Sequence, residues 1–417
     1  MSPVRLGVRA NAGQFALLVC VNALVGAMVG LERSVLSLVG KESFGVRSTT
    51  AILAFVLAFG AAKALTNLGA GGLADRWGRK RLLVAGWVLA LPVAPLIALA
   101  PSWWYVVAAN VLLGANQGLA WSMTVVMKID LAGPRRRGLA LGLNEAAGYV
   151  GLAAAAFASG ALAAGYAPRT VVWIGAALIS VTGLLLSSVA VRDTRAHVAH
   201  EQRAHGDGDA KALCLRASFR RATVGDRTLR ACSHAGLVNN LNDALAWGLA
   251  PLYLAAHGAS VGEIAVVAAV YPVVWGFSQL LTGWVSDHAS RKPLIAGGML
   301  VQAVALGLLA AGSGSFAASL AAAAVLGVGT AMVYPTLLAA VSDATQPRDR
   351  VRALGVYRFW RDCGFVLGAL IAGLAADGAS AEAAIVLVAA LTGASGLLVA
   401  VTRWRQPQRL LEPAHAP

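Results

Sequence analysis

Long apolar stretches separated by short polar segments are the most regular feature of the chain. Each stretch holds about 20 or more residues of low polarity, the length that an α-helix needs to cross a bilayer. Charged residues, Gly and Pro bound the stretches, so their limits are visible in the sequence. They predict twelve membrane-spanning helices at 14–38, 49–73, 82–100, 103–127, 138–165, 170–191, 231–256, 261–285, 294–312, 316–341, 353–376 and 383–402.

One hydrophilic segment divides these helices into two sets of six. The predicted organisation is an N-terminal six-helix bundle (1–191), a basic cytoplasmic linker (192–230), a C-terminal six-helix bundle (231–403) and a cytoplasmic tail (404–417). The linker carries three histidines near two aspartates, but their spacing is too loose to indicate a metal site, so we expect no metal and no cofactor. These residues are His197, His200, His205, Asp207 and Asp209.

Composition supports the membrane assignment. Hydrophobic residues make up 58% of the chain and charged residues 13%, whereas about 25% of a soluble domain is charged. A soluble or disordered chain is therefore excluded, and the predicted fold class is an all-α polytopic membrane protein. The first stretch is too long for a cleaved signal peptide, so we expect it to remain as the first span.

The net charge of +15 is explained by topology. Basic residues concentrate in segments that face one side of the bilayer, and we count Lys128 among them, in the segment after the fourth span. The opposite loops hold only Lys41, Arg47 and Arg169. Because Lys and Arg are retained in the cytoplasm, both termini are predicted to be cytoplasmic, in the inner membrane of the cell. This distribution argues against a nucleic-acid partner.

The two halves share a motif in the turn after their second helix. Both copies place an Asp at the end of one helix and Arg-Lys four residues later, so that carboxylate and guanidinium are expected to meet across a tight turn. The first copy contains Gly71, Asp75, Arg76, Arg79 and Lys80, and the second contains Gly283, Asp287, Arg291 and Lys292.

With this repeat, the chain resembles the major facilitator superfamily (MFS) of secondary transporters, whose signature in this turn is G-x-L-a-D-r-x-G-r-k. The first copy matches at every fixed position, and the second has Ser290 where a Gly would fall. The resemblance covers the whole chain and implies two six-helix bundles that rock around a central cavity. It also implies that the motif residues form a cytoplasmic latch that stabilises the state open to the outside. The alternative is that these charges only fix turns and topology.

Charged residues within the predicted spans indicate the transport path, because charge at bilayer depth is costly and is usually functional. Lys63 and Asp243 lie near the bilayer centre without a partner in their own helix. Arg358 and Asp362 are four residues apart, so a pair within one helix is expected there. The candidate substrate and coupling residues are Glu32, Arg33, Lys63, Gln117, Trp121, Glu145, Asn239, Asp243, Arg358, Arg361 and Asp362.

Two transport functions agree with this set. The first is proton-coupled export of an amphipathic compound or metabolite, in which Asp243, Glu145 or Glu32 takes up and releases the proton. The alternative is an organic-anion carrier in which Lys63, Arg358 and Arg361 hold the anionic group. The sequence favours the first, because acids without partners occur in both halves. We expect a monomer whose partners are a small-molecule substrate, protons and the lipid bilayer.

Other functions and subfamilies find less support. The sequence contains no nucleophile motif, no P-loop and no large soluble domain, which argues against an enzyme or a receptor. Gly114 stands where proton-coupled members of the superfamily often carry Arg, and Gly148 is not followed by the Pro that is frequent in drug antiporters. Aromatic residues near the path suit an amphipathic cargo or ordinary packing, and they are Trp121, Trp247, Tyr271, Trp275, Tyr334 and Trp360.

Overall fold

The computed structural model describes residues 6–132, 137–197, 213–288, 290–312, 314–345 and 349–404, and these ranges contain helices and no strand. Most of the predicted tail lies outside the described residues. So do His200, His205, Asp207 and Asp209 of the linker. The prediction that the linker binds no metal is therefore not addressed.

Twelve helical rods form the described part of the chain, and each coincides with one predicted span. Four rods contain a break or a π-helical turn and so carry two or three labels. The first half contains α1 (Ala12–Arg33), α2 (Leu36–Glu42), α3 (Thr49–Trp77), α4 (Arg79–Ala90), α5 (Val93–Ala98), α6 (Trp103–Ala132), α7 (Arg137–Ala163), α8 (Pro168–Leu185) and η2 (Leu186–Ala190). The short elements α10 (Leu215–Arg220) and η3 (Arg221–Gly225) precede the second half. This half contains α11 (Arg227–Ala244), η4 (Leu245–Leu249), α12 (Ala250–Ala256), α13 (Val261–His288), α14 (Arg291–Ala311), α15 (Phe316–Asp343), α16 (Arg350–Gly378) and α17 (Ala381–Val401).

Ten of these rods are long and apolar enough to cross a membrane by composition alone. The other two are α6 and the rod α11–η4–α12, which carry more polar residues, including Asn116 and Gln117 in the first and the run from Asn239 to Asp243 in the second. Both still have the necessary length, because 30 helical residues extend about 45 Å. Their polar residues lie inside the molecule, because both rods contribute to its interior.

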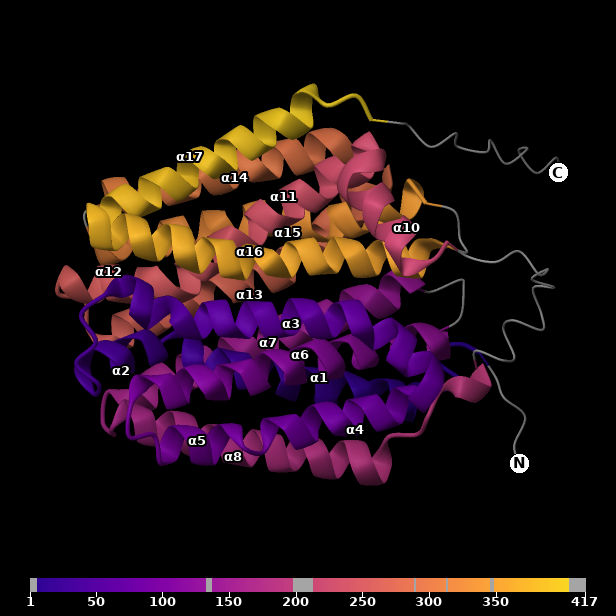
Figure 1. The fold of residues 1–417 in the computed structure, drawn as a ribbon, viewed down its shortest axis with the longest axis horizontal. Helices are drawn as coiled ribbons and strands as arrows, with labels where there is room; N and C mark the ends of the chain where they lie inside the picture. Colours follow the sequence, from indigo (N-terminus) through magenta and orange to yellow (C-terminus); the bar gives the residue numbers. More distant parts are fainter. Residues whose placement is uncertain are drawn as a thin grey trace.

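The rods lie lengthwise in two layers, with the first half in one layer and the second half in the other (Figure 1). We call the end where α1 begins and α17 ends the terminal end, and the opposite end the far end. Along the boundary between the halves, α3 packs against α16 and α7 packs against α13. The boundary is therefore formed by two pairs of long helices.

Glycines allow α1 and α7 to approach closely. A Cβ atom on Gly26 would lie 1.9 Å from the carbonyl oxygen of Gly148, and one on Gly30 would lie 2.1 Å from that of Leu152. Neither position tolerates a side chain, so the two backbones pack directly on one another. Small residues in transmembrane helices serve this purpose.

The two halves are joined tightly at the far end. The carboxylate of Asp377, near the end of α16, accepts hydrogen bonds from Ser48 Oγ (2.6 Å) and from the backbone nitrogens of Thr49 (2.5 Å) and Thr50 (3.0 Å) at the start of α3. We call this contact the far-end clasp. Nearby, Ser37 of α2 donates to the carbonyl oxygen of Gly248 in η4 at 2.9 Å. The far end is thus closed in this conformation.

Candidate functional site

A cavity of about 570 Å³, including its solvent-open part, lies between the two halves. Helices α1, α3, α6 and α7 of the first half contribute to its wall, together with α11, η4, α15 and α16 of the second. Its lining residues are Val29, Phe59, Lys63, Asn67, Gln117, Trp121, Ser122, Tyr149, Leu152, Asn240, Asp243, Trp247, Tyr334, Arg358, Arg361 and Phe365. Charged, amide and aromatic groups therefore meet in the middle of the molecule.

Two of the cations in this wall have no salt bridge. The ammonium of Lys63 lies over the rings of Phe59 (5.4 Å), Phe365 (5.4 Å) and Trp121 (5.9 Å), which attract it through their π faces. Among the described residues, no carboxylate lies within salt-bridge distance of Lys63 or Arg358. Both cations line the cavity with their charge uncompensated by a direct partner.

The third cation, Arg361, belongs to a hydrogen-bonded network that joins the halves. Its Nε and Nη2 donate to Asp362 Oδ1 at 2.9 and 2.6 Å, and Nη1 donates to Tyr334 at 2.5 Å. The other carboxylate oxygen of Asp362 accepts from Asn67 Nδ2 of α3 at 2.5 Å. The predicted pair of Asp362 with Arg358 is thus wrong: Asp362 pairs with its neighbour Arg361, whose guanidinium reaches it in two contacts.

Asp243 lines the cavity and is held by a hydroxyl group. It is 1% exposed and accepts a short hydrogen bond from Tyr271 of α13, whose oxygen also lies 3.2 Å from Thr330 Oγ1. No basic side chain of the described part forms a salt bridge with it. The π-helical turn η4 begins two residues after Asp243, and such irregularities are often found at functional sites.

Glu145 and Gln117 lie on the first half's side. Glu145 Oε1 accepts from Trp121 Nε1 (3.2 Å) and from Asn144 Nδ2 (3.1 Å), and its Oε2 has no partner among the described residues. Gln117 donates to the carbonyl oxygen of Val25 at 2.8 Å. Glu145 is therefore connected to the cavity through the indole of Trp121.

Three predicted residues lie elsewhere. Asn239 accepts from Gln302 Nε2 at 3.0 Å, inside the second half and away from the cavity. Glu32 and Arg33 are buried at the end of α1, and the guanidinium of Arg33 lies behind two rings of the cavity wall, those of Phe59 and Trp247. Among the aromatic candidates, Trp360 bonds to Thr223 and does not line the cavity.

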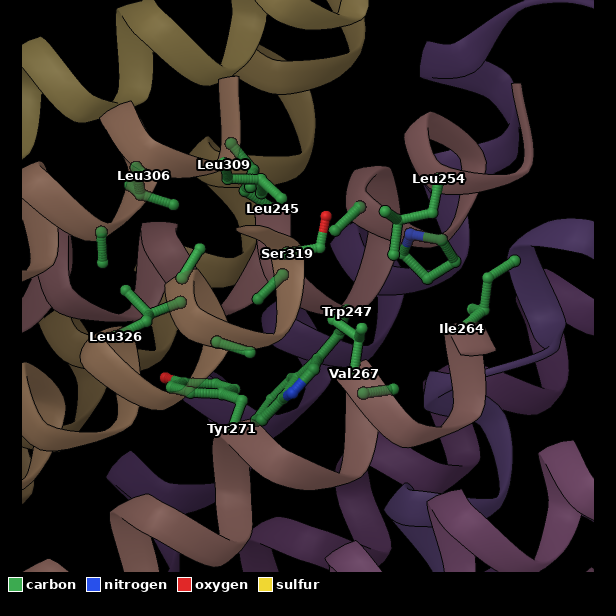
Figure 2. Close-up of a pocket in the computed structure, with 17 residues that line it drawn as sticks. Leu245, Trp247, Leu254, Ile264, Val267, Tyr271, Leu306, Leu309, Ser319 and Leu326 are labelled. Atoms are coloured by element: carbon green, nitrogen blue, oxygen red, sulfur yellow. The ribbon is translucent and has the colours of Figure 1, made fainter. Parts of the chain in front are cut away.

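A second cavity of about 510 Å³ lies within the second half (Figure 2). Its walls come from η4, α12, α13, α14 and α15, and nearly all its side chains are apolar. Trp247 and Tyr271 stand side by side on its wall, and Ser319 is one of its few polar groups. Trp247 belongs to both cavities, so the indole separates them.

The repeated turns form matching contacts at the terminal end. Arg79 lies 3.6 Å from Asp130 of α6, and Arg291 lies 2.5 Å from Asp343 of α15. Each Arg also donates to a carbonyl oxygen five residues earlier, at the end of the preceding helix. Gly78, with φ of 94°, makes the first turn possible, because residues with a Cβ rarely adopt this conformation.

The other residues of the repeated turns form fewer side-chain contacts in the described part of the chain. The side chains of Asp75 and Asp287 lie outside the described part, so their expected contacts with the arginines remain a prediction. Arg76 is exposed, Lys80 binds Asp193 through its backbone nitrogen at 3.1 Å, and Lys292 and Gly283 are half-buried.

Sequence reasoning missed several polar residues. Lys128, which we assigned to a cytoplasmic segment, is fully buried in α6 and donates to the carbonyl oxygen of Leu18 at 3.1 Å. Asn67 joins the halves through its bond to Asp362, and Ser122 Oγ of the same half donates to Asn67 Oδ1 at 2.7 Å. The polar character of these positions within apolar runs was the available signal.

Comparison with known proteins agrees with the helical arrangement and the repeated turns. The sequence profile of the Major Facilitator Superfamily matches residues 15–229 and 232–417. The chain belongs to the Major Facilitator Superfamily. This MFS protein is accordingly a multi-pass membrane protein and a secondary transporter of small molecules, not an enzyme.

Two solved structures share the fold of this MFS transporter. A bacterial homolog to the human lysosomal transporter Spinster, in an inward-facing and unoccupied conformation, has a TM-score of 0.70 and 16% identity, over 95% of this chain and 98% of that one. The nucleoside transporter NupG has a TM-score of 0.71 and 13% identity, over 92% and 99%. At these identities the likeness concerns the fold alone.

Proposed function

We propose that this MFS transporter carries a small organic anion with an aromatic or other apolar part, and that the central cavity binds it. The observation that carries the proposal is the pair of cations, Lys63 and Arg358, that line the cavity without a carboxylate partner from the described residues. Charge that is buried in a membrane without a partner is expensive, so it is usually retained to bind a substrate. An anion would supply the missing hydrogen-bond acceptors.

Asp243 in the cavity wall and Asp362 next to Arg361 have other partners, so they leave this positive charge available. Asp362 is occupied by Arg361 and Asn67, and Asp243 is held by Tyr271. The surrounding rings of Phe59, Trp121 and Phe365 would contact the apolar part of the substrate while the cations hold its anionic group.

The proposed substrate class can be tested with three probes: benzoate, naphthalene-1-sulfonate and phenyl phosphate. We expect at least one to raise the melting temperature of the purified protein, because ligands stabilise the native state by mass action. In proteoliposomes, Lys63→Met and Arg358→Gln should each weaken its uptake by about tenfold or more, which is the usual effect of losing a charge-assisted hydrogen bond. Lys41→Gln, which removes an exposed positive charge from the far end, should have no effect. If no probe is taken up by the wild-type protein, or if both cavity variants transport normally, the proposal is wrong.

Proton coupling is a second proposal, and it rests on Asp243. This buried carboxylate lines the cavity and accepts a hydrogen bond from the neutral hydroxyl group of Tyr271, so the loss or gain of a proton would change the charge of the binding site. Such a change of charge would allow protons that move down their gradient to drive the export of an amphipathic compound. In proteoliposomes with an imposed pH gradient, Asp243→Asn should abolish gradient-driven transport and retain exchange; full gradient dependence in this variant would contradict the role.

We further propose that the protein is a monomer in the cytoplasmic membrane with its terminal end inside the cell. The turn between α3 and α4, which carries four basic residues from Arg76 to Arg81, lies at that end. The far end holds Lys41, Arg47 and Arg169. This asymmetry is typical of the orientation that retains positive charge in the cytoplasm. Protease protection of a C-terminal tag in sealed cells would test it.

A further inference from the structure

One buried cation beyond the cavity, toward the far end, has no hydrogen-bond partner. Arg33 is the last residue of α1; its side chain is 0% exposed, and its Nε, Nη1 and Nη2 atoms all lack a partner among the described residues. A guanidinium has five N–H donors, and burying them unsatisfied with a full charge is costly. The structure of the described part therefore leaves these donors available to a ligand.

Two aromatic rings cover this guanidinium. Its central carbon lies 4.8 Å from the ring centre of Phe59 in α3 and 4.7 Å from that of Trp247 in η4. The π faces attract the cation but accept none of its in-plane hydrogen bonds. Both rings also line the central cavity, so a single layer of aromatic side chains separates Arg33 from Lys63 and the proposed anion site.

The neighbouring acids do not replace a ligand. Glu32 and Asp243 act on Arg33 electrostatically, but neither forms a salt bridge with it in the described part of the chain. Asp243 is directed to Tyr271 instead. Because these carboxylates leave the N–H donors of Arg33 unbonded in the described part, the site suits an anion that accepts those hydrogen bonds.

We infer that Arg33 is a second anion-binding site, which receives the carboxylate, sulfonate or phosphate group of the substrate after Lys63 and Arg358. This inference rests on the proposed function. Arg33 and Phe59 belong to the first half and Trp247 to the second, so rocking of the halves withdraws the indole and connects the guanidinium to the cavity. The apolar cavity on the other side of Trp247 gives the ring space to move into (Figure 2).

The test compares uptake from the two sides of the membrane, in right-side-out and inverted vesicles, with the same three anions as probes. When the anion is added at the far end, Arg33→Gln should raise the anion concentration that gives half-maximal uptake by about tenfold or more. When the anion is added at the terminal end, this concentration should change less than about twofold. Arg33→Lys should retain most of the affinity because it keeps the charge. Without anion, Arg33→Gln should melt at or above the wild-type temperature, since an uncompensated buried charge is removed. Lys41→Gln is the matched control.

The results decide whether Arg33 is an anion-binding site or a structural brace. If Arg33→Gln melts well below the wild type and loses uptake equally from both sides, Arg33 is a structural brace between the rings and the inference is wrong. If Arg33→Gln transports normally from both sides while Arg358→Gln does not, the second site is wrong and the proposed function stands. If neither variant affects any of the three anions, or if the wild-type protein carries none of them, both proposals fail.

Discussion

The far-end clasp offers a direct way to change the balance between conformations. Asp377 of the second half caps the start of α3 in the first half, with its carboxylate facing the positive end of the helix dipole. Ser48 also caps α3 by itself, because its hydroxyl oxygen accepts from the backbone nitrogen of Ala51 at 3.2 Å. Asp377→Ala should therefore loosen the contact between the halves without unwinding α3.

The expected magnitude follows from helix capping. Loss of a capping side chain costs about 0.5–2 kcal/mol, and Asp377 is exposed to solvent, so three hydrogen bonds do not add in full. A change of about 1–2 kcal/mol alters an equilibrium about five- to thirtyfold. Because the clasp exists only when the far end is closed, Asp377→Ala should raise the ratio of far-end-open to far-end-closed molecules by this factor.

The ratio can be measured by electron paramagnetic resonance distances between two spin labels at the far end. Suitable positions are the exposed residues Glu42, which ends α2, and Ala379, which follows α16, each replaced by Cys after the four native cysteines are removed. Glu382→Ala is the matched control, since Glu382 pairs with His257 within the second half at 3.4 Å. An unchanged distance distribution in Asp377→Ala, or an equal change in Glu382→Ala, would refute the reasoning.

Three further predictions concern packing and the repeated turns. Gly30→Ala should greatly reduce the yield of folded protein in size-exclusion chromatography, because its Cβ would lie 2.1 Å from a carbonyl oxygen of α7, whereas Gly307→Ala, which has no atom within 4 Å, should be neutral. Gln302→Leu should lower the free energy of unfolding by about 2–3 kcal/mol, because two buried asparagines of α11 lose their hydrogen-bond partner. The melting temperature should fall accordingly, and a melting temperature equal to that of the wild type would contradict this. Arg291→Gln and Asp343→Asn should each slow transport, by about tenfold for a contact that contributes about 1.4 kcal/mol. The double variant should be no slower than either single variant, because both substitutions remove the same contact. Additive losses in proteoliposome uptake would show that the two residues act separately.

The helical rods were predictable because their signals are local. Apolar runs, a glycine such as Gly78 and a capping residue such as Ser48 act within one or two turns of helix. The main error concerns Lys128, which lies near the end of an apolar run and close to several arginines. Its burial depends on the carbonyl oxygen of Leu18, more than a hundred residues away, and no local pattern contains that information.

In the candidate site, too, local features were predictable and contacts between helices were not. Depth in the membrane follows from position within a span, and it selected Lys63 and Asp243, which both line the cavity. Helical spacing placed Arg358 and Asp362 on one face, but it could not say that Asp362 would bind Arg361 and Asn67 instead. Partners from different helices depend on the rotation of each helix, which a single sequence does not contain.

These pairings change the functional argument, because function depends on which charges are left without partners. The sequence favoured proton-coupled export on the ground that acids without partners occur in both halves. In the structure two of these acids accept hydrogen bonds, Asp243 from Tyr271 and Glu145 from Trp121, whereas one buried oxygen of Glu145 and one of Glu32 have no partner among the described residues. Along the described part of the path, Lys63, Arg358 and Arg33 are cations without a hydrogen bond, and they lie in the cavity and behind the rings of Phe59 and Trp247. A path whose unmatched charge is positive is suited to an anion, whereas a proton on Asp243 would control how strongly that anion is held.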